Sequence, residues 1–335
     1  MFVVSHKESD TAVLPIRCGI VLAGGDGQRL RPFVHRLKGV NLPKQYVNFF
    51  GSRSMIETTF ERTEKLLLPD HLFTVVNRDH LQFPEVKRQL SSRSRGTVVV
   101  QPQNKETGPG LLLPLIYLYK RYPKSTVAVF PSDHFVLEED LLMSHVDLAF
   151  RVVEWNPSRL VLLGVEPSEA ETDYGYILPT QRAETLTPLQ VREVARFVEK
   201  PKLTSVRKLI LDGGLWNTMI MVFKAKTLLN VVRRVSPRLF RLFGLICQAI
   251  GTAGEKDVVE QAYKNMQSVN FSRGLLEAVS LHRPSPLWVL PVRGVHWSDW
   301  GSEDRITSEL QKLGRRDNSK ECQQVALEQG GLVSD

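Results

Sequence analysis

The sequence predicts an α/β protein with a mixed, mostly parallel central sheet that is flanked by helices and carries a small antiparallel extension. The first observation is an apolar strand, CGIVLAGG, at 18–25. The second is that short β-branched segments then alternate with helical ones, as in a doubly wound sheet. The third is that apolar segments beyond residue 174 follow one another with little helix between them, which indicates antiparallel strands.

The elements of the first half follow in order. The segment SMIETTFERTEKLL predicts a helix over 54–67. Its apolar face consists of Met55, Ile56, Thr59, Phe60, Thr63 and Leu67. A crossover helix is expected at 139–155. Four further strands are predicted at 72–77, 96–101, 126–133 and 159–165.

The second half predicts a different pattern. Helices are expected around 237–251 and 271–280, after three strands at 174–179, 191–201 and 219–225. No internal repeat and no low-complexity linker interrupts the chain. We therefore expect one continuous unit at 16–302, with a flexible leader at 1–15 and a short helical tail at 303–335.

Composition limits the class of protein. With 335 residues, of which 42% are hydrophobic, the chain can bury a substantial core, and we expect a soluble globular protein. No apolar stretch approaches the roughly 20 residues that a membrane span requires, and the first residues lack the apolar centre of a secretory signal. Three scattered cysteines, Cys18, Cys247 and Cys322, form no CxxC pair, which favours a reducing, cytoplasmic location.

The net charge of +8 has two interpretations. A nucleic-acid-binding protein is one, but the 44 basic residues are spread along the chain and no DNA- or RNA-binding motif is present. We therefore expect no nucleic-acid partner. A small polyanionic substrate accounts for the same excess of basic residues.

A glycine-rich loop follows the first strand. In LAGGDGQRLRP, at 22–32, Gly24, Gly25 and Gly27 match neither the dinucleotide fingerprint nor the P-loop pattern. Arg29 follows the glycines, and PKQ adds Lys44, so backbone N–H groups, guanidinium groups and an ammonium group could meet a phosphate-rich ligand together. The alternative is a tight turn between solvated arginines.

Two isolated aspartates stand near strand ends. Asp133 in PSDH follows a predicted strand at the carboxyl edge of the sheet, and Asp299 in WSDWGS follows another. Because a carboxylate that faces phosphates needs a cation between them, the pair predicts a Mg²⁺ site. The alternative for Asp133 is a helix N-cap.

A further polar pair ends another strand. In FVEKP, Glu199 could accept hydrogen bonds from sugar hydroxyls, and Lys200 could bind a second phosphate. A solvated ion pair is the alternative. The chain has no GxSxG, no HExxH and no cysteine with a histidine partner. A reaction whose nucleophile is an ionised phosphate would need none of these.

Seven motifs together carry a resemblance to a known family. They stand in the order LAGGDGQRLRP, PKQ, PSDH, YGYI, FVEKP, WN and WSDWGS. In this order the sequence resembles sugar-phosphate nucleotidyltransferases, and most of all mannose-1-phosphate guanylyltransferases, over about 17–302. The resemblance implies a Rossmann-like nucleotidyltransferase fold. It also implies a catalytic domain at 16–302 without the β-helix or cupin-like domain that many members carry.

The resemblance implies a role for each matching residue. The metal ligands would be Asp133 and Asp299, and the catalytic residues would be Arg29, Lys44, Asp133, Lys200 and Asp299. Nucleotide binding is expected from Leu22, Ala23, Gly24, Gly25, Gly27, Arg29, Gln101, Glu106, Thr107 and Asp133. Glu106 departs from the family pattern and is expected here because guanine needs an acceptor for its N1 and N2 donors; a solvated loop residue is the alternative. Sugar phosphate binding is expected from Gly175, Glu199, Lys200 and Asn217.

The implied reaction joins a nucleoside triphosphate, expected to be GTP, to a sugar 1-phosphate, expected to be mannose 1-phosphate, with release of pyrophosphate. The chain departs from the family pattern in QPQNKETGPG at 101–110, at Asp173, in WNTMIM at 216–221 and at Trp300. The alternatives are another base and sugar pair, or an inactive paralogue that binds nucleotides as a sensor or subunit. The oligomeric state stays open, with a homodimer among the alternatives.

Overall fold

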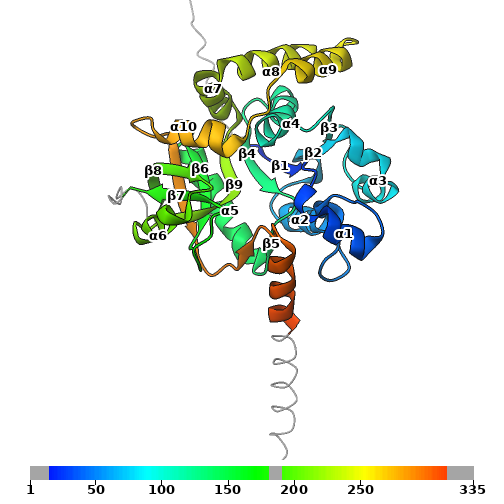
Figure 1. The fold of residues 1–335 in the computed structure, drawn as a ribbon. Helices are drawn as coiled ribbons and strands as arrows, with labels where there is room; N and C mark the ends of the chain where they lie inside the picture. Colours follow the sequence, from blue (N-terminus) through cyan, green and yellow to red (C-terminus); the bar gives the residue numbers. More distant parts are fainter. Residues whose placement is uncertain (1–14, 181–190, 315–335) are drawn as a thin grey trace, which may run out of the picture.

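The central feature is a twisted nine-stranded sheet, seen in a computed structural model that describes residues 15–180 and 191–314 (Figure 1). The strand order is β3-β2-β1-β4-β9-β6-β10-β8-β7. The leader expected at 1–15, except its last residue, lies outside the described residues, as do Cys322 and the tail beyond 314. The part of the tail that is described, 303–314, is helical.

From β1 to β6, the strands of the large sheet alternate in sequence with helices. They are β1 (Arg17–Ala23), β2 (Leu72–Asn77), β3 (Val98–Gln101), β4 (Thr126–Pro131), β6 (Leu160–Val165), β7 (Gly175–Pro179), β8 (Arg192–Glu199), β9 (Leu215–Lys224) and β10 (Leu287–Val292). A separate two-stranded sheet pairs β5 (Phe135–Val136) with β11 (Trp297–Ser298). Every residue of β2, β4, β6 and β10 is buried, which is why these strands are continuous apolar runs.

Helices cover both faces of the sheet. One face packs on α1 (Arg31–Lys38), α2 (Met55–Glu64), α3 (Pro84–Leu90), α5 (Glu139–Trp155) and α6 (Leu203–Leu211). The other packs on α4 (Thr107–Arg121), α7 (Ala225–Val235), α8 (Pro237–Ala249), α9 (Glu255–Asn265) and α10 (Glu277–Ser280). Along β1, Val21 and Ala23 join the first core while Cys18 and Ile20 join the second, as the two-residue period of a strand requires.

Strand β9 joins the two halves of the sheet. It runs antiparallel to β4 on one side and to β6 on the other. Beyond it, β6 and β10 are parallel, whereas β8 pairs antiparallel with β10 and with β7. The predicted fold class, a mostly parallel α/β sheet with an antiparallel extension, is confirmed.

Several expected elements agree closely with the structure. The strand at 72–77 and the helix at 139–155 are found at their predicted bounds. On α2, the predicted apolar face is buried, although the helix ends before Leu67, which is itself buried. Its start is fixed by a capping box, in which Ser54 and Glu57 exchange hydrogen bonds.

Other expectations were wrong in detail. The second half contains α6 between β8 and β9, where little helix was expected. Val206 and Leu209 form the buried face of this helix, which is too short to give a clear helical pattern in the sequence. Strand β9 begins at Leu215, four residues before the strand predicted at 219–225, and so includes the WN motif. The helix expected at 271–280 opens with a π-helical turn, Ser272–Leu276, before α10.

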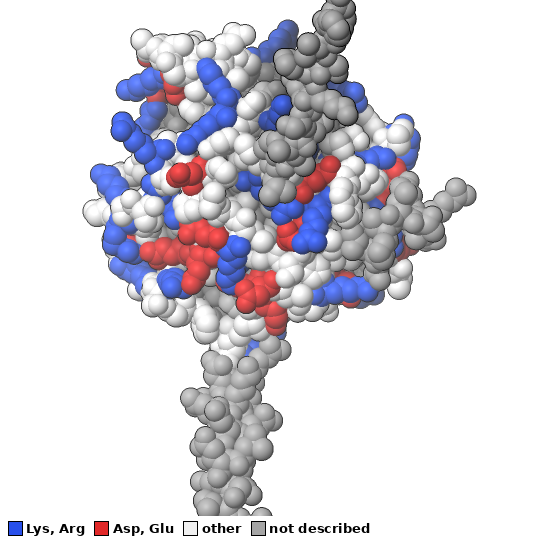
Figure 2. All heavy atoms as spheres, turned by 180° about the vertical axis from the view of Figure 1, so that it is seen from behind, with Lys and Arg blue, Asp and Glu red and all other residues white. Residues whose placement is uncertain are grey.

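The surface agrees with the dispersed charge of the sequence. On the face shown in Figure 2, basic and acidic side chains are interspersed. Within 15–180 and 191–314, no helix combines the length and the apolar character that crossing a membrane requires.

Candidate active site

A cavity of about 420 Å³ lies at the carboxyl ends of β1 and β4 and extends toward β7, β8 and β9. The predicted site residues that line it are Leu22, Gly24, Gly25, Gly27, Arg29, Gln101, Glu106, Thr107, Asp133, Gly175, Glu199, Lys200, Asn217 and Asp299. Lys44 lines an adjoining hollow together with Asp133 and Asp299. Only Ala23, buried at the end of β1, lines neither. The structure therefore brings together nearly every residue that the motifs indicated.

The glycine-rich loop is held in place by its neighbours. The amide of Gln45 donates hydrogen bonds to the carbonyl oxygens of Ala23 and Gly25, at 2.8 and 2.9 Å. Gly27 adopts the left-handed conformation at φ 57°, and a Cβ there would lie 3.2 Å from the backbone nitrogen of Lys44. Glycine therefore suits this position both by conformation and by space.

Asp26 anchors the same loop. Its carboxylate accepts hydrogen bonds from the amides of Asn77 and Asn104, at 3.2 and 3.0 Å, and lies 3.3 Å from Nε2 of His80. Burial alone would raise the pKa of Asp26, but the hydrogen bonds from Asn104, His80 and Asn77 outweigh it and lower the pKa. The loop therefore keeps its shape without a ligand, as a preformed site requires.

Lys44 links the two aspartates. Its Nζ lies 3.0 Å from Oδ2 of Asp133 and donates to the backbone carbonyl of Asp299 at 2.6 Å. Burial would raise the pKa of Asp133, but the Lys44 ammonium outweighs it, so the pKa lies below its ordinary value. Asp133 therefore stays ionised beside the cavity. The alternative N-cap role is wrong, because α5 begins at Glu139 and is preceded by Glu138.

Asp299 is held by a second cation. Its Oδ1 lies 2.5 Å from the guanidinium of Arg305 and accepts hydrogen bonds from Gly301 N, at 2.8 Å, and from the Tyr174 hydroxyl, at 3.2 Å. Arg305 also pairs with Glu171 and stands over the Tyr174 ring. Three donors thus orient the Asp299 carboxylate from one side.

The donor set fits a divalent cation only in part. Oδ1 of Asp133 lies 3.7 Å from Nε2 of His134, and among the described residues no hydrogen bond to Oδ2 of Asp299 is found. Hard carboxylate oxygens of this kind suit Mg²⁺. Within the same residues, no cluster of three or more His, Cys, Asp or Glu side chains could hold a metal ion. A cation here would therefore need phosphate oxygens to complete its coordination.

The opposite end of the cavity lies on β7, β8 and β9. Gly175 pairs with Glu199, and a Cβ on Gly175 would lie 2.7 Å from Oε2 of Glu199. Burial raises the pKa of Glu199 above its ordinary value. Lys200 follows at the end of β8, where its exposed side chain borders the cavity. Asn217 lines the same end from β9.

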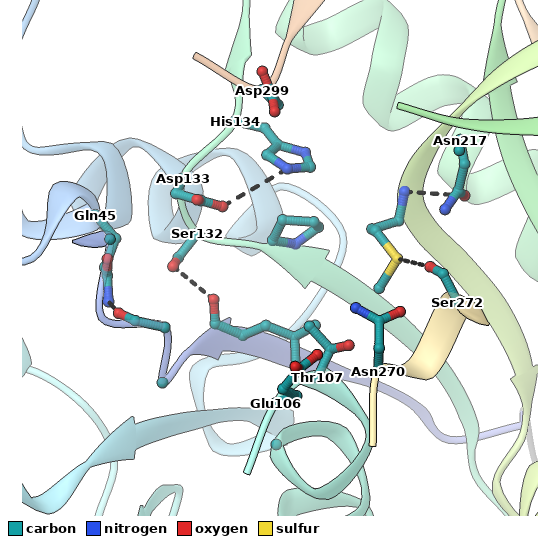
Figure 3. Close-up of a pocket in the computed structure, with 18 of the residues that line it drawn as sticks. Gln45, Glu106, Thr107, Ser132, Asp133, His134, Asn217, Asn270, Ser272 and Asp299 are labelled. Carbon is teal, nitrogen blue, oxygen red and sulfur yellow. Dashed lines mark hydrogen bonds and ion pairs between the residues drawn. The ribbon is translucent and has the colours of Figure 1, made fainter. Parts of the chain in front are cut away.

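The end of the segment 101–110, in which the chain departs from the family pattern, is the start of a helix. Residues 107–110 form the first turn of α4, and Glu106 precedes it. The Thr107 hydroxyl oxygen accepts a hydrogen bond from the backbone of Phe271, at 2.8 Å. Gln101 is buried beside this helix, where its Oε1 finds no hydrogen-bond partner among the described residues. Figure 3 shows Glu106 and Thr107 on one wall of the cavity, across from Asp299.

Backbone strain is concentrated at this site. In the described part of the chain, four residues other than glycine have positive φ: Glu106 at 68°, Lys200 at 50°, Met219 at 58° and Trp300 at 45°. The first three line the cavity, and the carbonyl of Trp300 accepts a hydrogen bond from Lys44 at 3.3 Å. Such conformations cost roughly 1–3 kcal/mol each and gather at functional sites.

Sequence reasoning did not assign several residues that line the cavity. They include Gln45, Asn104, His134, Tyr174, Met219, Asn270, Ser272 and Trp297. Gln45, His134, Tyr174 and Trp297 stand within the quoted motifs, which was the available signal. Burial lowers the pKa of His134, and its Nδ1 has no hydrogen-bond partner among the described residues. Its imidazole is therefore neutral.

Comparison with known proteins agrees with this geometry. Residues 18–315 match the nucleotidyl transferase family, so the chain belongs to this family.

Among its relatives, mannose-1-phosphate guanylyltransferase 2 of Escherichia coli O157:H7 is 26% identical over 84% of this chain and 58% of its own length. Mannose-1-phosphate guanylyltransferase of Salmonella montevideo is 28% identical over the same shares. The chain therefore spans somewhat over half the length of these relatives. In fold it is similar to a crystal structure from Thermus thermophilus described as mannose-1-phosphate geranyltransferase, with a TM-score of 0.70, 24% identity and coverage of 85% of this chain and 76% of that one.

Proposed function

We propose that this chain transfers a nucleoside monophosphate from a nucleoside triphosphate to a sugar 1-phosphate, with release of pyrophosphate. The observation that carries the proposal is the convergence of Lys44, Asp133 and Asp299 beside the glycine-rich loop. This set combines donors for phosphate oxygens with two carboxylates that could hold a cation. At the other end, Lys200 and Glu199 offer a charge and an acceptor for a sugar phosphate.

In the proposed reaction, an oxygen of the sugar phosphate attacks the α-phosphorus of the triphosphate, and the bond to the leaving pyrophosphate breaks. The nucleophile is already ionised, so positioning and neutralisation of charge supply most of the catalysis. Backbone N–H groups of the loop, with Arg29, would bind the triphosphate. Bound Mg²⁺, held by Asp133, Asp299 and phosphate oxygens, would neutralise the phosphate charge.

Arg29 already has a partner in the chain. It forms an ion pair with Asp173 at 3.3 Å, in which both side chains are largely exposed. Exposed pairs of this kind contribute at most about 1 kcal/mol. A triphosphate could therefore recruit Arg29 at little cost.

For the base, we propose guanine. The side chain of Gln101 borders the cavity next to Gly110, and its Oε1 is a buried acceptor that lacks a partner among the described residues. Guanine carries donors at N1 and N2, which would satisfy such an acceptor. For the sugar, we propose mannose, on the similarity to proteins named mannose-1-phosphate guanylyltransferase.

The proposal is tested by turnover. The protein is incubated with Mg²⁺, each of the four common nucleoside triphosphates and a panel of sugar 1-phosphates, and pyrophosphate release is measured. We expect the highest kcat/KM with GTP and mannose 1-phosphate. A preference for another nucleotide and sugar pair would support the proposed type of reaction and contradict the proposed substrates. No pyrophosphate with any pair would overturn the proposed function.

A variant of Lys200 separates the two substrates. We expect Lys200→Ala to raise the KM for the sugar 1-phosphate by about 10–100-fold, because a charged hydrogen bond to phosphate contributes about 1.5–3 kcal/mol. The KM for the nucleotide should change much less. Lys202→Ala removes the same charge from an exposed position outside the cavity and is the control. Equal rises in both KM values would assign Lys200 to the triphosphate.

A further inference from the structure

Met219 occupies an unusual position in β9. Its φ of 58° is left-handed, and the pairing of β9 with β6 shifts register nearby, between Leu162 and Gly164. For a residue other than glycine this conformation costs roughly 1–2 kcal/mol. The side chain is half-buried and lines the cavity at the end where Asn217 lies. An irregular strand thus turns a flexible apolar side chain toward the expected sugar.

Two contacts fix Met219. Its backbone nitrogen donates to Oδ1 of Asn217 at 3.2 Å, and the hydroxyl of Ser272 donates to its sulfur at 3.2 Å. Ser272 is 4% exposed, so this hydroxyl is held inside the protein. Figure 3 shows Asn217 and Ser272 at the same end of the cavity, with both contacts drawn as dashed lines. The carboxamide oxygen of Asn217 is therefore engaged by the chain, and the Ser272 hydroxyl lies against the thioether.

The neighbouring wall leaves little spare room. A Cβ on Gly175 would lie 2.7 Å from Oε2 of Glu199 and 3.4 Å from Cβ of Asn217. The side chains of Glu199 and Asn217 therefore occupy the space beside Gly175, and a ligand at this end also meets the Met219 thioether on β9. A thioether is apolar and only a weak acceptor.

We infer that Met219 is a specificity-determining residue, whose thioether restricts the sugar end to hexose 1-phosphates without an acylamino substituent. The inference rests on the proposed function and concerns the same site. The carbon face of a plain hexose can pack against sulfur and methyl groups. An acylamino group that faces Met219 would place its amide N–H and carbonyl against these apolar atoms, which offer them no good partner, at a cost of about 1–3 kcal/mol. The Met219 backbone is held by Asn217, and its sulfur lies 3.2 Å from the Ser272 hydroxyl, which positions the thioether at this end of the cavity.

The test compares two matched sugars, glucose 1-phosphate and N-acetylglucosamine 1-phosphate, with mannose 1-phosphate as the reference. For each, kcat/KM is measured with GTP and Mg²⁺ in the wild type, Met219→Gly and Met219→Leu. The glycine variant removes the side chain and suits the positive φ. We expect it to reduce the discrimination against the acetylated sugar by about tenfold or more. The leucine variant keeps the bulk and should retain the discrimination within about threefold.

The outcomes separate this inference from the proposed function. Turnover of plain hexoses with unchanged discrimination in Met219→Gly would overturn the role of Met219 alone, as would a wild type that uses both matched sugars equally. No turnover with any pair would overturn the proposed function, and the inference with it. Thermal unfolding checks that each variant is folded. If the glycine variant shows no cooperative transition, Met219→Ala supplies the same comparison.

Discussion

We expect Asp133→Asn to lower kcat for pyrophosphate release by about 10²–10³-fold. The substitution keeps the shape of the side chain and removes the charge that faces Lys44 at 3.0 Å and would bind the cation. The protein should remain folded, because Lys44 retains the carbonyl oxygens of Asp299 and Trp300 as hydrogen-bond acceptors. Initial rates at saturating substrates, together with a thermal unfolding curve, measure both effects.

The matched control is Asp70→Asn, which makes the same chemical change at an exposed position outside the cavity. It should keep the wild-type rate. Binding of Mn²⁺, followed by its paramagnetic signal in the presence of nucleotide, gives a second measurement that does not depend on turnover. A wild-type kcat in Asp133→Asn would remove this carboxylate from the proposed mechanism.

The second large effect is expected for Lys44→Met. Lys44 is 5% exposed and contacts one carboxylate and two backbone carbonyls. Methionine fills a similar volume but leaves these acceptors without their donor, so we expect a loss of about 1–3 kcal/mol in the free energy of unfolding. Removal of the charge from the phosphate site should also lower kcat by about 10²–10³-fold.

Denaturant titration and initial rates measure these two quantities, with Lys87→Met on the exposed surface of α3 as the control. Lys44→Arg separates the charge from the geometry, because it keeps the cation but cannot reproduce the compact ammonium in a buried space. If Lys44→Met were as stable and active as the wild type, the contacts of Lys44 with Asp133 and Asp299 would contribute neither to stability nor to catalysis.

The sequence predicted the fold well where burial produces a clear pattern. Strands such as 72–77, buried on both faces, appear as continuous apolar runs, and the long amphipathic helix at 139–155 has an unambiguous period. The sequence did not predict elements that are too short to show a period or that contain residues unfavourable for their structure. The paired strands β5 and β11 have two residues each, too few for any periodicity. Helix α4 contains Pro114 and two early glycines, which normally argue against a helix.

The candidate site was predictable to the extent that it consists of motifs. The glycine-rich loop follows β1 and PSDH follows β4, and these parallel neighbours bring their carboxyl ends to one edge, so the order of these motifs along the chain implied their proximity. What could not be predicted was the support around those residues. Arg305 lies in a helix with no recognisable motif, yet it orients Asp299. The positive φ of Met219 depends on an irregular pairing with β6 that no local pattern encodes.

The position of β9 has a mechanical consequence. This strand is hydrogen-bonded to β4 on one side and to β6 on the other, so both ends of the cavity are built on the same continuous β-sheet. Asp133 follows β4, and Asn217 lies on β9 itself, so one continuous sheet connects them. The distance between the attacking oxygen and the phosphorus would then be built into the sheet during folding, and the two substrates would reach alignment by docking instead of by domain closure.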